Sequence, residues 1–201
     1  MQPATVTSQR QGATRTPKPP DREHRSPPRY RRPQTRECDG ATLWRLAVAA
    51  GGLDANSEYA YHMLAEYYPD TCIIAEVDGQ PAGFVTGFRP PSAPSTLFVW
   101  QIAVDPSCRG RGIARGMLNA LLDRLVQDGV QYLEATITPS NEPSRHAFHA
   151  VARRFNATCE ESPLFWGESF VSGEHEDEFR YRIGPFRRTP GASPREEVTH
   201  A

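Results

Sequence analysis

Residues 97 to 138 follow the order strand, glycine-containing turn, helix, strand. The run LFVWQIAV is rich in the β-branched and aromatic residues that favour strands. Arg109 to Gly112 leads into an amphipathic pattern that predicts a helix to about Asp128, and YLEATIT predicts the next strand. This is the pattern of a βαβ unit, so the chain is predicted to be a mixed α/β protein.

A hairpin signal precedes this unit. The apolar runs CIIAEV and AGFVTGF are joined through Asp78-Gly79, a dipeptide typical of tight β-hairpins. The hairpin and the strand after it predict an antiparallel meander in front of the βαβ unit. A TIM barrel or a standard Rossmann fold does not fit a meander at the front of so short a core.

The remaining elements are predicted from caps and breakers. A first strand is expected over Tyr30 to Arg36 and a late strand over Phe179 to Ile183. The predicted helices are Thr42 to Ala50 with Thr42 or Asp39 as cap and Gly51-Gly52 as stop, Ser57 to Tyr68 ended by Pro69, and Ser144 to Phe155.

Composition divides the chain into one domain and two tails. Residues 1–28 hold six prolines and a net charge of +3, with almost no large apolar side chain. Such a segment buries too little surface to offset its ordering entropy, so we expect disorder there. We expect the folded domain at 29–188 and a flexible tail at 189–201.

Charge and cysteine usage exclude several classes of protein. The formal net charge of −1 does not favour nucleic-acid binding, and no apolar run is long enough to span a membrane. The cysteines, Cys38, Cys72, Cys108 and Cys159, lie far apart in sequence and show no metal-ligand spacing. We expect reduced thiols, no metal and a cytoplasmic protein.

The turn RGRG precedes the predicted helix and has the features of an anion site. The first amides of a helix have no partner within it, and the helix dipole is positive there. Gly110 and Gly112 allow close approach of the backbone, and Arg109 and Arg111 add positive charge. A turn of this kind also occurs without any ligand. The spacing is neither that of a P-loop nor that of a GxGxxG motif.

The run Arg109-Gly110-Arg111-Gly112-Ile113-Ala114 resembles the acyl-CoA pyrophosphate loop of the GCN5-related N-acetyltransferases. The resemblance implies a central, mostly antiparallel sheet with a splayed parallel strand pair and helices on both faces. It also implies that acetyl-CoA binds along the preceding strand and loop. The cofactor-binding residues it indicates are Ile102, Ala103, Val104, Arg109, Gly110, Arg111, Gly112, Ile113, Ala114, Asn141 and Ser144.

Further motifs narrow the resemblance to the L-2,4-diaminobutyrate acetyltransferases of ectoine synthesis. They are LDANSEYAYHML, TLFVWQIAVDPSCRGRGIA, YLEATITPSNEPSRHAF, ESPLF and HEDEF with IGPF, spread over residues 29 to 186. Members of that family acetylate the γ-amino group of diaminobutyrate, and the resemblance further implies a homodimer. Phe148 stands where the wider superfamily carries a tyrosine that protonates the leaving thiolate.

The substrate of such an enzyme has two amines and one carboxylate. The attacking amine has to lose a proton, and the other needs a counter-charge. By resemblance the substrate-binding set is Asp54, Tyr59, Trp100, Gln101, His175 and Glu178. We expect Asp54 to pair with an ammonium group, Trp100 to wall the pocket, and Glu178 or His175 to act as the catalytic proton acceptor.

Several alternatives remain open at this stage. Asp54 could act only as a helix cap, HEDE could be a solvated charge run, and Trp100 could belong to the core. Gln101, next to Trp100 on the strand, should face the opposite side unless a bulge rotates it. The acceptor could be another small amine, such as a polyamine or amino acid, and a non-catalytic acyl-CoA sensor is a third possibility. His146 and His149 are expected at the surface.

Overall fold

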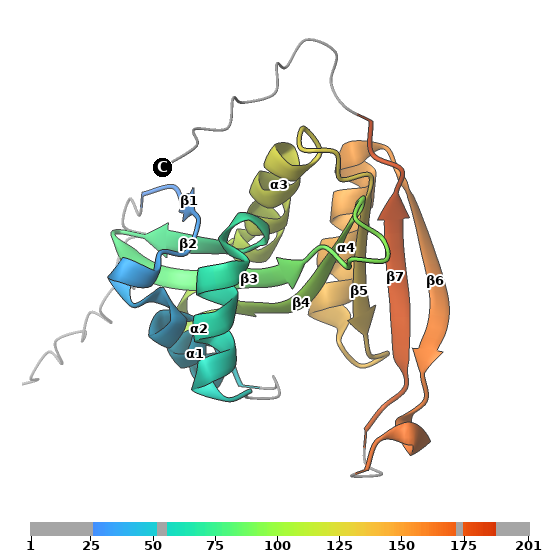
Figure 1. The fold of residues 1–201 in the computed structure, drawn as a ribbon, viewed down its shortest axis with the longest axis horizontal. Helices are drawn as coiled ribbons and strands as arrows, with labels where there is room; N and C mark the ends of the chain where they lie inside the picture. The colour runs from blue at the N-terminus through green and yellow to red at the C-terminus, as the bar shows by residue number, and fades with distance from the viewer. Residues whose placement is uncertain (1–25, 52–55, 172–174, 188–201) are drawn as a thin grey trace, which may run out of the picture.

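The computed structural model describes residues 26–51, 56–171 and 175–187. Most of both predicted tails lies outside these ranges. The described strands form one seven-stranded sheet in the order β1-β2-β3-β4-β5-β7-β6 (Figure 1). The elements are β1 (Arg29–Arg31), α1 (Asp39–Ala50), α2 (Glu58–Tyr67), β2 (Ile73–Val77), β3 (Gln80–Phe88), β4 (Thr96–Val104), α3 (Ile113–Leu125), β5 (Tyr132–Ile137), α4 (Glu142–Phe155), β6 (Thr158–Phe165) and β7 (Glu178–Gly184).

The sheet is antiparallel except where β4 meets β5. These two strands run parallel and share only three pairs, from Thr96↔Tyr132 to Phe98↔Glu134. Beyond Phe98 they diverge, as Figure 1 shows, and β4 has no partner strand on that side among the described residues. The predicted mostly antiparallel sheet with a splayed parallel pair is confirmed.

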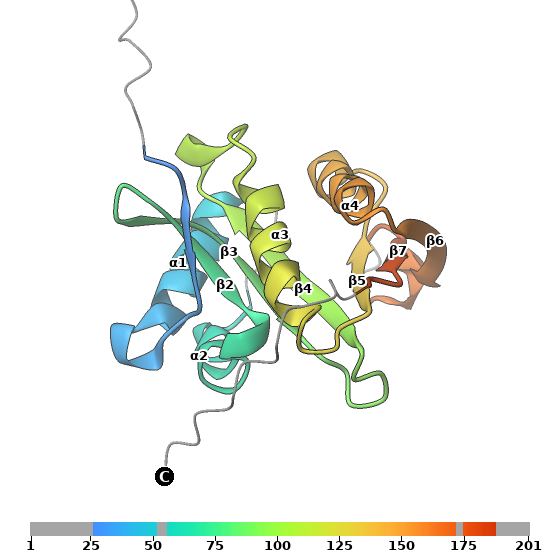
Figure 2. The same cartoon turned by 90° about the horizontal axis from the view of Figure 1, so that it is seen from above.

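Helices cover both faces of the sheet. Apolar residues of α1 and α2 pack against inward side chains of β2, β3 and β4 in one buried cluster. A larger cluster joins α3 and α4 to the opposite face. Figure 2 shows α3 and the pair α1–α2 on opposite sides of the meander. No helix in residues 26–51, 56–171 or 175–187 has the length and apolar character needed to cross a membrane.

The hairpin and the helix stops follow the sequence prediction. Asp78 and Gly79 connect β2 to β3, and both have positive φ, at 52° and 74°. The helix α1 ends before Gly51, and α2 ends before Pro69. Ser57 stands at the N-cap position of α2, although its side chain makes no capping hydrogen bond.

The start of the domain differs from the prediction. The first strand ends at Arg31, and α1 begins at Asp39, so Thr42 lies inside the helix and caps nothing. Asp39 is buried and accepts two hydrogen bonds from the Arg31 guanidinium, at 2.5 and 3.0 Å, and one from the Gln34 N–H. The Asp39 carboxylate thus links the end of β1 and the segment after it to the start of α1. It acts as the ion-pair partner of Arg31 and does not cap the helix.

The sequence did not predict β6. This strand lies at the edge of the sheet and pairs only with β7, and most of its side chains are exposed. It contains Pro163, which cannot donate to a ladder, and the adjacent acids Glu160 and Glu161. An exposed edge strand lacks the apolar alternation on which the other strands were recognised.

Candidate active site

The open edge of β4 presents backbone groups to the space between β4 and β5. The Asp105 N–H bonds the Ala82 carbonyl on β3 at 2.9 Å. Because backbone groups alternate in direction along an antiparallel strand, those of Ile102 and Val104 point away from β3. They lie beyond the last pair with β5, so they face the splay. The main chain there can pair with an extended ligand.

A bulge interrupts β4 at Trp100. Thr86 pairs with Gln101 and the next residue, Gly87, pairs with Val99, which leaves Trp100 as the extra residue. Trp100 is 38% exposed, whereas Gln101 is buried. The exposed tryptophan does not belong to the core, and its indole is available to line a pocket.

The bulge reverses the faces of β4. Leu97 and Val99 belong to the cluster packed on α3 and α4, whereas Ala103 belongs to the cluster on α1 and α2. Unbroken alternation would have kept all three on one face. Gln101 therefore turns toward α2 and shares a face with Trp100, because bulged residues interrupt the alternation.

Gln101 is held by a residue that the sequence did not single out. The buried Tyr61 hydroxyl of α2 donates to Gln101 Oε1 at 2.9 Å. Its ring also packs edge-on against Phe84, with centroids 6.1 Å apart. Tyr61 lies within the motif EYAYHML, but the motif alone does not predict its contact with Gln101. The bulge in β4 is what places Gln101 on the face of the sheet that α2 covers.

We expect Tyr61→Phe to lower kcat/KM for the amine substrate by about tenfold, equivalent to about 1.4 kcal/mol. The substitution removes the donor that orients the Gln101 amide and keeps the ring. Steady-state kinetics and urea unfolding measure the two effects, and we expect stability to fall by about 1 kcal/mol. Tyr67→Phe, on the exposed end of the same helix, is the control and should change neither quantity.

The turn before α3 exposes a row of backbone amides. Gly110 and Gly112 have φ of 72° and 74°, in the left-handed region that other residues rarely adopt. The first helical hydrogen bond runs from the Gly116 N–H to the Gly112 carbonyl at 2.9 Å. The N–H groups of Ile113, Ala114 and Arg115 precede that bond, so they have no acceptor within the helix. The turn has the geometry of an anion site, as predicted.

The Arg109 side chain also contributes to the fold. Its Nη2 donates to the Ala50 carbonyl at the end of α1, and its Nε donates to the Val104 carbonyl at 3.4 Å. A cation at the C-terminal end of a helix is favourable because the dipole is negative there. Arg109 thus connects the turn, the open edge of β4 and α1.

We expect Arg109→Ala to lower the free energy of unfolding by about 1 kcal/mol, because two carbonyl groups lose a charged donor. Urea unfolding measures the change. Arg111→Ala serves as the control because, among the described residues, the hydrogen bond of the Arg111 side chain is to the Cys108 sulfur, at 4.0 Å, and not to a backbone carbonyl. Equal stability of the two variants would contradict a bridging role for Arg109.

The second loop predicted to bind the cofactor is at the start of α4. Asn141 caps this helix, and its Oδ1 accepts from the Ser144 N–H at 3.2 Å. Since α3 follows β4 and α4 follows β5, both helix N-termini lie at the carboxyl ends of the diverging strands (Figure 1). Phe148 is buried in the core, so its ring is not available to a ligand.

His175 and Glu178 lie together at the start of β7. His175 Nε2 is 3.8 Å from Glu178 Oε1, and the imidazole stacks on Phe170 with centroids 3.9 Å apart. The other carboxylate oxygen, Glu178 Oε2, is buried and has no hydrogen-bond donor among the described residues. A buried carboxylate oxygen of this kind favours a cationic or hydrogen-bonding ligand.

The other two acids of the HEDE run, Glu176 and Asp177, form hydrogen bonds that connect the segment before β7 to neighbouring loops. Glu176 accepts from the Ser140 hydroxyl and, at 3.3 Å, from the Ser140 N–H. Asp177 Oδ1 accepts from the Gly167 N–H at 2.8 Å. Each acid of the run therefore has a specific contact, although Glu176 is exposed to solvent.

The described residues bring together only part of the predicted substrate-binding set. Asp54 lies outside the described ranges. Tyr59 is 71% exposed on the first turn of α2. The edge of the sheet at which β5 ends and β7 begins carries Glu178, since β7 pairs with β5 from Ile137↔Phe179 onward. The predicted substrate-binding residues within the described ranges thus lie on the bulge of β4, on the first turn of α2 and at the start of β7.

Comparison with known proteins agrees with this geometry. Residues 40–151 match the model of the acetyltransferase (GNAT) family. The L-2,4-diaminobutyric acid acetyltransferase of Marinococcus halophilus is 47% identical over 150 residues, which are 75% of this chain and 87% of the relative. The corresponding protein of Nocardia farcinica is 46% identical over 147 residues, 73% of this chain and 76% of its own length.

Comparison with solved structures also identifies an acetyltransferase of diaminobutyrate. The diaminobutyrate acetyltransferase EctA from Paenibacillus lautus, in complex with its substrate L-2,4-diaminobutyric acid and coenzyme A, superimposes with a TM-score of 0.75 at 42% identity. The match covers 82% of this chain and 99% of that one. The ribosomal-protein-S18-alanine N-acetyltransferase of Escherichia coli, 16% identical with a TM-score of 0.61, shares the fold alone. The chain belongs to the acetyltransferase (GNAT) family and, within it, to the family of the L-2,4-diaminobutyric acid acetyltransferases.

Proposed function

We propose that this chain transfers the acetyl group of acetyl-CoA to the γ-amino group of L-2,4-diaminobutyrate. The observation that carries the proposal is the match over 99% of an enzyme solved with this amine and coenzyme A. The splay of β4 from β5, with two helix N-termini at its mouth, supports the same conclusion from the geometry. The product is the ectoine precursor N-γ-acetyl-diaminobutyrate.

The pyrophosphate of acetyl-CoA binds at the start of α3. The unpaired amides of Ile113 and Ala114 donate to its oxygens, and the helix dipole adds a favourable field. The amide-containing arm of the cosubstrate then runs along β4 and pairs with the backbone of Ile102 and Val104.

Acetyl transfer needs an electrophilic carbonyl and a neutral amine. A backbone N–H on the open side of β4 stabilises the oxyanion of the tetrahedral intermediate. The N–H of Ile102 is the first such group after the bulge. Glu178 accepts the proton of the attacking γ-ammonium group through its buried Oε2. His175 keeps the carboxylate in place, and Trp100 closes the pocket over the amine.

Charge on the substrate selects its orientation. Asp54 pairs with the α-ammonium group, and the Trp100 indole N–H donates to the α-carboxylate. This arrangement directs the γ-nitrogen toward Glu178 and the thioester. With Phe148 in the core, CoA departs as a thiolate.

Substrate profiling by thiol release tests this function. We expect diaminobutyrate to react faster than spermidine or ornithine, and NMR of the product to place the acetyl group on the γ-nitrogen. Faster turnover of spermidine would contradict the proposal and favour a polyamine acetyltransferase. Binding of acetyl-CoA without turnover of any amine would favour a sensor.

We further propose a cytoplasmic homodimer formed through β6. In support, β6 is one of the two edge strands of the described sheet, and Leu164, Phe165 and Trp166 at its end are 39%, 48% and 53% exposed. A monomer rarely exposes consecutive large apolar residues. Sedimentation equilibrium should give twice the chain mass, and Phe165→Lys should give the mass of one chain. A wild-type monomer would contradict this.

A further inference from the structure

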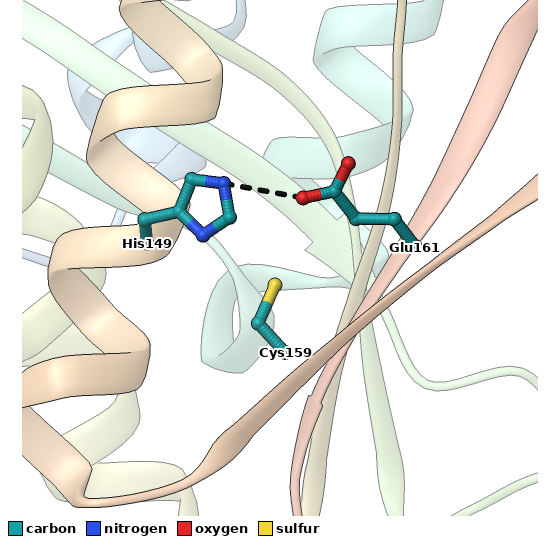
Figure 3. A group of neighbouring side chains, drawn as sticks. All are labelled: His149, Cys159 and Glu161. Carbon is teal, nitrogen blue, oxygen red and sulfur yellow. Dashed lines mark ion pairs between the residues drawn. The ribbon is translucent and has the colours of Figure 1, made fainter.

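Three side chains of ligand type meet between α4 and β6, away from the acetyl-transfer site. They are His149 on α4 and Cys159 and Glu161 on β6 (Figure 3). Each offers a different donor atom, and the three atoms lie within 4.8 Å of one another. His149 Nε2 is 3.2 Å from Glu161 Oε1. Because Cys159 and Glu161 are two residues apart on one strand, both face the helix.

The sequence spacing of His149, Cys159 and Glu161 does not match a known metal-binding motif. Cys159 follows His149 by ten residues and carries no neighbouring cysteine, so no metal motif was recognised. The strand β6 was not predicted either, and only its pairing with β7 turns Cys159 and Glu161 toward α4. The prediction that His149 lies free at the surface is also incomplete, since it is half-buried against Glu161.

The group is poorly arranged for nucleophilic catalysis. Burial and the nearby Glu161 carboxylate raise the pKa of the Cys159 thiol, which keeps it protonated and unreactive at neutral pH. The same carboxylate beside an imidazole and a thiol is a favourable donor set for a divalent cation, because the cation displaces the thiol proton.

We propose that His149, Cys159 and Glu161 bind one divalent cation of the zinc type. A nitrogen, a sulfur and an oxygen ligand suit zinc and its surrogate cobalt better than magnesium or calcium, which prefer oxygen alone. Ligand atoms around tetrahedral zinc lie about 3.5 Å apart, given metal–ligand bonds of about 2.0–2.3 Å. Small rotations of the Cys159 and Glu161 side chains bring the three atoms to that spacing.

Neighbouring residues already orient the carboxylate. The Tyr181 ring lies edge-on to His149, with centroids 5.9 Å apart, and its hydroxyl accepts from Arg145 Nε at 3.0 Å. The Tyr181 hydroxyl also interacts with the Glu161 carboxylate. Partners of this kind fix ligands in metal sites. The ion would join α4 to β6, and water would complete its coordination.

Titration of the whole chain with cobalt(II) under anaerobic conditions tests the site. We expect one equivalent to bind with a thiolate-to-cobalt charge-transfer band in the near ultraviolet. Cys159→Ser should abolish the band, and His149→Gln should weaken cobalt binding at least tenfold. Cys38→Ser, which removes an exposed thiol, and His146→Gln, which removes a more exposed histidine of the same helix, are the matched controls and should bind as wild type.

Thermal unfolding with and without zinc gives a second readout. Zinc should raise Tm of the wild type and of both controls, because a ligand of the native state stabilises it by mass action. It should leave Tm of Cys159→Ser unchanged. The absence of a charge-transfer band in the wild type would overturn the proposal, and so would a band that persists in Cys159→Ser. Neither result bears on acetyl transfer, so this proposal and the proposed function can fail separately.

Discussion

Replacement of Glu178 by Gln should lower kcat/KM for acetyl transfer by about 10²- to 10⁴-fold, the usual contribution of a general base. Gln has the shape of Glu but cannot accept the ammonium proton. The buried Oε2 faces no donor among the described residues, so the fold loses little when the charge is removed. The pH dependence of kcat/KM, measured by thiol release, should lose its acidic limb.

Two further variants make the result specific. Glu160→Gln removes a carboxylate from the exposed part of β6 and should leave the rate unchanged. His175→Ala should lower the rate less than Glu178→Gln and shift the acidic limb, because the imidazole 3.8 Å away only positions the carboxylate. Near-normal rates and an unchanged acidic limb in both Glu178→Gln and His175→Ala would exclude both residues as the base.

The second large effect is expected at Gly110. Gly110→Asp should weaken acetyl-CoA binding by about 10²- to 10³-fold, since like charges about 4–5 Å apart at an effective dielectric of about 20 repel by about 3–4 kcal/mol. Apart from the neighbours of Gly110 in the chain, no atom of the described residues lies within 4 Å of the position that a Cβ would take there, so the first atom of a side chain has room. Asp is also among the residues that tolerate positive φ. Calorimetry with coenzyme A measures the change.

Gly110→Asn is the matched control because it has the same shape and no charge. We expect it to bind coenzyme A within about tenfold of wild type, because Asn adopts positive φ more readily than most residues and adds no charge. Equal losses in the Asp and Asn variants would show that backbone strain, and not charge, sets the affinity. That result would contradict an anion site at the start of α3.

Local patterns predicted much of the fold because each relevant residue acts on its neighbours. The Asp78-Gly79 turn, the stop at Gly51 and the helix after Gly112 depend on backbone conformations that short sequences encode. The order of the meander and the βαβ unit then leaves few arrangements of the sheet. The splay between β4 and β5 was predicted from the family resemblance and not from these patterns.

Features that arise only from tertiary pairing were missed or, like the bulge beside Gln101, were left open as alternatives. The bulge at Trp100 exists because β3 and β4 differ by one residue in register, and it decides that Gln101 meets Tyr61. Alternation alone gives the wrong face for Gln101. The roles of Asp39 and of Glu176 were also hidden, because their partners lie on other segments of the chain.

The short contact between β4 and β5 has a consequence for how the molecule opens. Within the described part of the chain, three residue pairs between β4 and β5 connect the half-sheet β1–β4 to the half-sheet β5–β7. An extended ligand that pairs with β4 and reaches the N-termini of α3 and α4 would connect the two half-sheets, in the way that an additional strand between β4 and β5 would. Saturation with coenzyme A should therefore slow amide hydrogen exchange in β5 and β7 as well as in β4, although β7 does not border the splay.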